Sequence, residues 1–115
     1  MKFMFLLYVP VEVRDDPEAR ASMQQWMDYG RALADAGAHL GNNALEGLDA
    51  ATTVRVRDGE TLVSDGPFAE TKEMLGGYYV IDVPDRDAAV AWASQVPCAP
   101  YGSIEVRPVM SFDAP

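Results

Sequence analysis

The chain contains two short, mainly apolar runs, and helical spacing follows each of them. Residues 3–9 (FMFLLYV) form the first run, which ends at Pro10, and residues 77–83 form a largely apolar run that ends at Pro84. Short apolar runs of this kind, without a polar face, are typical of strands that are buried on both sides. The pattern therefore predicts two central strands with apolar side chains on both faces.

A helix is expected after each run, because an aspartate stands where each helix would begin. Asp16 and Asp85 are favoured N-cap residues, and Pro17 suits the first helical position. Gly37 is expected to end the first helix in a left-handed conformation, and Gly30 to let that helix approach the sheet closely. The apolar stripes contain Met23, Trp26, Met27, Gly30, Leu33 and Ala34 in the first helix, and Ala89, Trp92, Ala93 and Val96 in the second.

The clearest local signal is a β-hairpin over residues 53–63. Its strands flank Asp58-Gly59, a favoured two-residue turn. In the register that this turn sets, Val54 faces Val63, and charged residues pair on the opposite side. The hairpin register is therefore well specified.

Two further extended segments complete the fold. Residues 38–48 hold a short strand or extended stretch, and residues 103–107 alternate apolar and polar side chains as a last strand. Two β-α-β halves of this kind predict an α+β, ferredoxin-like βαββαβ fold with an inserted hairpin. We expect a single domain over residues 1–115.

The apolar runs also predict self-association. Helices in this fold cover one face of the sheet, so the other face should be polar in a monomer. The side chains expected on the uncovered face are instead large and mostly apolar: Met4, Leu6, Tyr8, Tyr78 and Val80. Burying each such side chain stabilises a protein by about 1.5–3 kcal/mol, so we expect a homodimer packed sheet to sheet.

Composition excludes several classes of function. The net charge is −9, from 18 acidic and 9 basic residues without a basic cluster, so direct nucleic-acid binding is not expected. The first apolar run is too short to span a membrane and is not followed by a cleavage site. A single cysteine, Cys98, precludes an internal disulfide. We expect a cytoplasmic protein without membrane association.

The run SDGPFAETKE at residues 64–73 carries a family resemblance. Together with the opening MKFM, TTVRVRDG at residues 52–59, GGYY at residues 76–79 and EVRPV near the end, it resembles the YCII-related superfamily. The run DGPF resembles the branch of that superfamily named for these four residues. The resemblance covers nearly the whole chain and implies a dimeric α/β barrel, but it does not imply one particular reaction.

Three residues are candidates for acid–base chemistry. Asp65 could act as a general acid or base or anchor a ligand, or it could form an Asx-turn with its own backbone. His39, the only histidine, suits proton transfer near neutral pH. YCII-type relatives pair a helical histidine with an aspartate, but residues 22–29 contain no histidine here. Lys72 could bind an anionic substrate or form a surface ion pair.

Aromatic residues could form the walls of a ligand pocket, although core packing explains them equally well. The candidates are Tyr8, Trp26, Phe68 and Tyr79. One histidine and one cysteine, without a nearby pair of carboxylates, do not predict a metal site. No phosphate-binding loop or dinucleotide fingerprint occurs, so we expect no cofactor.

Two functional hypotheses follow. In the first, the protein is a cofactor-free enzyme with a cleft near Asp65, which performs proton transfer (isomerisation or elimination) on a small cyclic or anionic substrate. Lys72 or His39 would assist electrostatically. In the second, it is a non-catalytic binding or regulatory module, because the resemblance includes domains associated with extracytoplasmic-function sigma factors.

Overall fold

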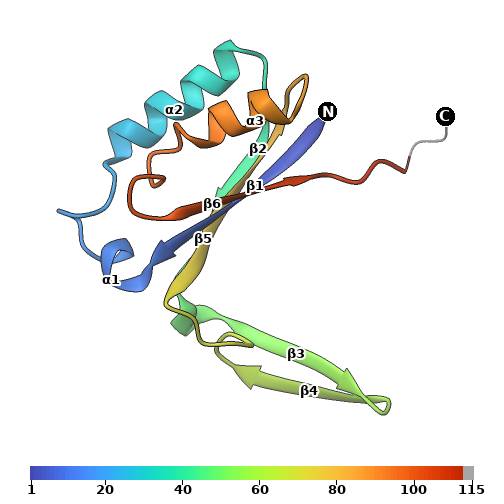
Figure 1. Ribbon diagram of the computed structural model, residues 1–115. Coiled ribbons are helices and arrows are strands. Elements are labelled where there is room, and N and C mark those ends of the chain that lie inside the picture. Colours follow the sequence, from blue (N-terminus) through green and yellow to red (C-terminus); the bar gives the residue numbers. More distant parts are fainter. Residues whose placement is uncertain (113–115) are drawn as a thin grey trace.

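The computed structural model describes residues 1–112 and contains a four-stranded antiparallel sheet with two helices on one face (Figure 1). The strand order is β2-β5-β1-β6, and β3 and β4 form a separate two-stranded sheet. The elements are β1 (Lys2–Pro10), α1 (Val11–Arg14), α2 (Met23–Asp35), β2 (His39–Ala44), the 3-10 turn η1 (Leu48–Ala50), β3 (Thr52–Arg57), β4 (Glu60–Asp65), β5 (Glu73–Asp82), α3 (Arg86–Ala93) and β6 (Ser103–Pro108).

This arrangement confirms the predicted α+β, ferredoxin-like fold. Helix α2 connects β1 to β2, α3 connects β5 to β6, and both helices cover the same face of the sheet. The β3–β4 hairpin is inserted between β2 and β5, as predicted. Residues 113–115 of the predicted domain lie outside the described residues.

The start of the first main helix differs from the prediction. Helix α2 begins at Met23 because Ser22 and Gln25 form a capping box. The Ser22 hydroxyl accepts a hydrogen bond from the Gln25 N–H at 3.2 Å, and the Gln25 side chain accepts one from the Ser22 N–H at 2.8 Å. Asp16 instead accepts a hydrogen bond from the Glu18 N–H, which makes a local turn.

The predicted end of the first helix and start of the second are confirmed, but α3 ends at Ala93, so Val96 of the predicted stripe lies after the helix. The Asp85 carboxylate accepts a hydrogen bond from the Ala88 N–H at 2.8 Å and caps α3. Gly37 follows α2 with a φ of +68°, the left-handed conformation that favours glycine. The expectation for Gly30 is wrong, because a Cβ placed there would meet nothing within 4 Å. Close backbone approach instead occurs at Gly77 of β5 and at Gly102, just before β6.

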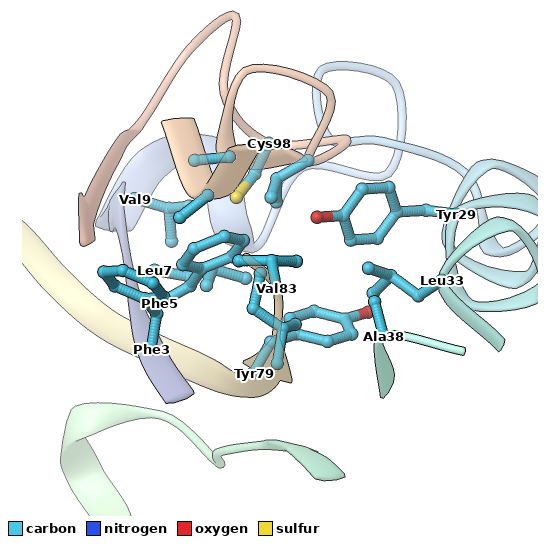
Figure 2. Close-up of a cluster of buried hydrophobic side chains, with 14 of the residues drawn as sticks. Phe3, Phe5, Leu7, Val9, Tyr29, Leu33, Ala38, Tyr79, Val83 and Cys98 are labelled. Carbon is cyan, nitrogen blue, oxygen red and sulfur yellow. The ribbon is translucent and has the colours of Figure 1, made fainter. Parts of the chain in front are cut away.

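The hydrophobic core lies between the sheet and the two helices. Figure 2 shows Phe3 and Phe5 of β1 in the same cluster as Leu33 of α2. The largest fully buried side chains are Phe3, Phe5, Leu33, Ile81, Val96 and Cys98. Polar groups in this layer are satisfied, since the Tyr29 hydroxyl donates to the Trp92 carbonyl at 2.9 Å.

The second face of the sheet has no helix over it. Along β1, buried residues alternate with half-buried ones, so the half-buried side chains lie on the face of the sheet opposite the core. The register between β1 and β5 shifts between Leu7 and Tyr8, which places Leu75 opposite Tyr8. We call this surface the open face; its apolar side chains are Met4, Leu6, Tyr8, Leu75, Tyr78 and Val80.

The hairpin has the predicted register and turn. Val54 pairs with Val63, Val56 pairs with Thr61, and Asp58 and Gly59 have φ values of +52° and +77°. Figure 1 shows the hairpin projecting from the sheet on the side opposite the helices.

Candidate functional site

A cleft of about 700 Å³ lies beside the start of α2. The segment before α2 and the first turns of this helix form one side, and strands β2 and β5 form the other. Volumes of this size are typical of sites for small ligands. The fold therefore builds a candidate binding site at the end of the helical layer.

Aromatic rings form the apolar part of the cleft. The rings of Trp26 and Tyr79 are nearly parallel, with an interplanar angle of 9° and centroids 6.5 Å apart. Tyr29 packs edge-on against Tyr79 at 5.4 Å and fixes the orientation of its ring (Figure 2). Burial raises the pKa of the Tyr79 hydroxyl, with a smaller effect from Cys98, so this group stays protonated at neutral pH.

Two arginines, Arg14 and Arg20, are also among the residues that line the cleft. The Arg14 guanidinium donates to the Leu45 carbonyl at 3.2 Å and to the Asp15 carboxylate at 2.8 Å. Arg20 donates to the Arg14 carbonyl at 3.1 Å, so the two residues are joined. A guanidinium has five N–H donors, so these hydrogen bonds do not use all the donors of either arginine. Within residues 1–112, neither Asp nor Glu is among the residues that line the cleft, although Asp15 pairs with Arg14.

Neutral polar groups complete the rim. The Asn43 side chain donates to the Tyr78 hydroxyl at 2.8 Å, and the Tyr101 hydroxyl accepts from the Ala21 N–H at 2.9 Å. Asn42 also lines the cleft, and its Oδ1 lies 2.8 Å from His39 Nε2. The rim can therefore donate and accept hydrogen bonds.

The structure brings some of the sequence-predicted site residues together. Trp26 and Tyr79 line the cleft, in agreement with the prediction that they share a pocket wall. His39 is exposed at the start of β2, with its ring centroid 6.4 Å from that of Tyr79. His39 therefore lies beside the cleft, next to two of the residues that line it, and its role stays a prediction.

The other predicted site residues do not line this cleft. Asp65 is exposed at the end of β4, Lys72 is exposed just before β5, and Phe68 is 79% exposed. Tyr8 lies on the open face. The physical reason is the hairpin, which carries the SDGPF segment away from the helical layer.

The signature segment instead closes the base of the hairpin. The Gly66 N–H donates to the Ala51 carbonyl at 2.7 Å, and the Thr53 hydroxyl donates to the Gly66 carbonyl at 2.8 Å. Gly66 has a φ of +95°, which requires glycine at this position.

Sequence reasoning missed Arg14, Arg20 and Tyr101, because no spacing or motif distinguishes them before the chain is folded.

Cys98 is a free, buried cysteine. Burial raises the pKa of the Cys98 thiol to about 11, so the thiol is protonated at neutral pH. Within residues 1–112, no group of three or more His, Cys, Asp or Glu side chains is placed to hold a metal ion. In the same range, every helix is too short or too polar to cross a membrane.

Comparison with known proteins identifies the family. Over 65 residues the chain is 52% identical to an uncharacterised protein of Rhizobium meliloti (strain 1021), a match that covers 55% of this chain. The match covers 52% of that protein, so the chain spans about half the length of this relative. The family model of the YCII-related domain matches residues 1–113. With the fold described above, this match shows that the chain belongs to the YCII-related family.

Proposed function

We propose that this protein binds a small organic anion with a flat apolar body in the cleft beside α2. The observation that carries this proposal is the composition of the cleft. Arg14 and Arg20 line it together with the nearly parallel rings of Trp26 and Tyr79, and no carboxylate of residues 1–112 is among its lining residues. In a chain with a net charge of −9, a cleft of this kind selects a ligand that the rest of the surface repels.

The two halves of the ligand are recognised by different forces. Guanidinium groups match the geometry of carboxylates and hold them through charge-assisted hydrogen bonds. Aromatic walls bury the flat part of the ligand and exclude water from around it. Arg14 is already held in place by Leu45 and Asp15, so little side-chain freedom is lost when a ligand binds.

Proton transfer on the bound anion would require a base beside the cleft. His39 is the nearest of the sequence-predicted candidates, through its contacts with Asn42 and Tyr79. Asp65 and Lys72 belong to the hairpin side of the molecule and do not line the cleft. Binding is therefore the function that the geometry supports best, and isomerase-type or lyase-type chemistry is the hypothesis that follows from it.

Fluorescence titration tests the proposal, because Trp26 lies in the cleft. In a Trp92→Phe background, Trp26 is the only tryptophan and reports on binding. We expect benzoate to change its emission at concentrations at least tenfold lower than benzamide, which has the same ring without the charge. We expect Arg14→Gln and Arg20→Gln to remove this preference.

The matched control is Arg31→Gln, which removes an exposed arginine of α2 that does not line the cleft. Its benzoate affinity should equal that of the parent protein. Equal affinity of the parent for benzoate and benzamide would contradict the anion preference. A parent protein that responds to neither compound would contradict the proposed cleft as a whole.

A further inference from the structure

We infer that the anion held in the cleft is a 2-oxo acid, and that the Tyr101 hydroxyl donates a hydrogen bond to its carbonyl oxygen. The inference rests on the proposed function and names the class of ligand within it. Two observations carry it: the Tyr101 hydroxyl is bound to the segment that carries Arg20, and its proton has no acceptor within residues 1–112.

Arg20 is the residue best suited to hold the carboxylate. Within residues 1–112 its guanidinium forms no ion pair, whereas Arg14 pairs with the Asp15 carboxylate at 2.8 Å. Arg20 donates to the Arg14 carbonyl at 3.1 Å, and this hydrogen bond does not use all of its N–H donors. A carboxylate takes two such donors in the bidentate geometry typical of guanidinium groups.

The Tyr101 hydroxyl lies beside the backbone of Arg20. Tyr101 belongs to the loop between α3 and β6, and its hydroxyl accepts a hydrogen bond from the Ala21 N–H at 2.9 Å. The Ala21 nitrogen forms the peptide bond with Arg20, and both Arg20 and Tyr101 line the cleft. A ligand that contacts both residues would therefore carry its carboxylate and a second polar atom close together.

The Tyr101 hydroxyl is left as a donor for the ligand. It accepts the Ala21 N–H, and its own proton has no acceptor among the described side chains and carbonyls. Tyr101 itself is held in place, because its N–H donates to the Cys98 carbonyl at 3.2 Å and Gly102 packs closely against the Tyr8 carbonyl oxygen. An acceptor oxygen on the ligand would complete this hydroxyl with little loss of side-chain freedom.

A carbonyl oxygen suits this position better than a hydroxyl group, because a ligand hydroxyl has a proton of its own to donate. Two of the side-chain acceptors along the cleft are already engaged. The Ser22 hydroxyl accepts the Gln25 N–H at 3.2 Å, and Asn42 Oδ1 lies 2.8 Å from His39 Nε2. No carboxylate of residues 1–112 lines the cleft to accept such a proton. The site therefore favours 2-oxo acids over 2-hydroxy acids.

The shape of the cleft favours the same class. A 2-oxo carbon is trigonal, so an aryl 2-oxo acid is flat from its ring to its carbonyl group, whereas a 2-hydroxy carbon is tetrahedral. The rings of Trp26 and Tyr79 are nearly parallel, with an interplanar angle of 9°, and flat walls of this kind favour flat ligands. The expected ligand therefore has a ring, a conjugated carbonyl group and a carboxylate.

Isothermal titration calorimetry of the full chain tests the inference with two probes that differ at one carbon atom. Phenylglyoxylate and phenylacetate have the same ring and the same charge, but only phenylglyoxylate has the 2-oxo group. We expect phenylglyoxylate to bind about tenfold more tightly, because phenylacetate leaves the Tyr101 donor unpaired. Tyr101→Phe should bind both probes equally, with the phenylacetate affinity of the parent protein. Mandelate, the 2-hydroxy analogue, should bind more weakly than phenylglyoxylate.

The matched control is Tyr8→Phe, which removes a phenol hydroxyl on the open face from a residue that does not line the cleft. This variant should keep the full preference for phenylglyoxylate. Unchanged phenylacetate affinity in Tyr101→Phe shows that its cleft is intact. The comparison of the three probes on the parent protein needs no variant, so it tests the 2-oxo group even where Tyr101→Phe lowers the stability.

Three results would overturn the inference: equal affinity of the parent for phenylglyoxylate and phenylacetate, tighter binding of mandelate, or a preference that Tyr101→Phe retains. In each of these cases the carboxylate probes still bind, so the proposed function stands. A parent protein that binds neither these probes nor benzoate would contradict the proposed function, and the inference with it.

Discussion

The carbonyl oxygen of Asn43 in β2 lies so close to Gly77 of β5 that a Cβ on Gly77 would be only 2.7 Å from this oxygen. Gly77 is buried in β5, opposite Ala44 of β2. The contact is with backbone, so a flexible side chain cannot simply move aside. The approach of the edge strand β2 to β5 therefore depends on the absence of a side chain at this position.

Gly77→Ala should lower the free energy of unfolding by about 1–3 kcal/mol, because overpacking forces the two strands apart. Urea unfolding measures the change. Gly41→Ala in β2 is the matched control, because a Cβ there meets nothing within 4 Å. Equal effects of the two substitutions would contradict a specific role of Gly77.

Gly30→Ala should stabilise the protein by about 0.5–1 kcal/mol, because alanine is the better helix former and the position has room for it. Thermal unfolding would show this as a higher midpoint temperature. A loss of stability would mean that α2 packs more closely at this residue than the structure shows.

Ser22→Ala should destabilise the protein by about 1 kcal/mol, because it removes the side-chain half of the capping box. Asp16→Ala should cost less, because Asp16 caps no main helix and only stabilises an exposed turn. Chemical unfolding of the two variants compares them directly. A larger loss for Asp16→Ala would favour the helix start that the sequence alone predicts.

Stability should fall as the pH rises from about 9 to 11. Burial raises the pKa of the Cys98 thiol from 9.0 to about 11, so the folded state keeps a proton that the unfolded state has already lost. Below about pH 9 the thiol is protonated in both states and does not affect the free energy of unfolding. Between pH 9 and 11 its ionisation in the unfolded state lowers that free energy by up to about 2 kcal/mol. Burial also raises the pKa of Tyr29 and of Tyr79, which adds a loss of the same sign above pH 10.

Cys98→Ala isolates the thiol in this pH dependence. The variant should be less stable at neutral pH, because it leaves a small cavity, but its stability should decrease less steeply between pH 9 and 11. Urea unfolding at several pH values provides the comparison. Identical pH profiles for the parent and the variant would exclude the thiol as a cause.

Most of the fold could be predicted from local patterns. The apolar runs identified β1 and most of β5, the Asp58-Gly59 turn identified the hairpin and its register, and Asp85 identified the start of α3. The start of α2 was mispredicted because Asp16 and Ser22 are both good N-cap residues. Only the Gln25 side chain, which completes the capping box, distinguishes them.

The candidate site could be predicted only in part. Trp26 and Tyr79 could be predicted as pocket residues because both are aromatic and belong to the predicted helix and strand, and both line the cleft. Arg14 ends the short helix α1 and Arg20 lies in the irregular segment before α2, and only the path of the chain between β1 and α2 brings them to the same cleft. The direction in which the hairpin projects is likewise a tertiary property, which is why the position of Asp65 could not be predicted.

The hydrogen bonds from Gly66 to Ala51 and from Thr53 to Gly66 hold the two ends of the β3–β4 hairpin together at its base. Gly66 therefore has a structural role at the base of the hairpin that is separate from any contact with a ligand. Chains with the same motif would then hold the hairpin in the same orientation, whatever substrate each one binds.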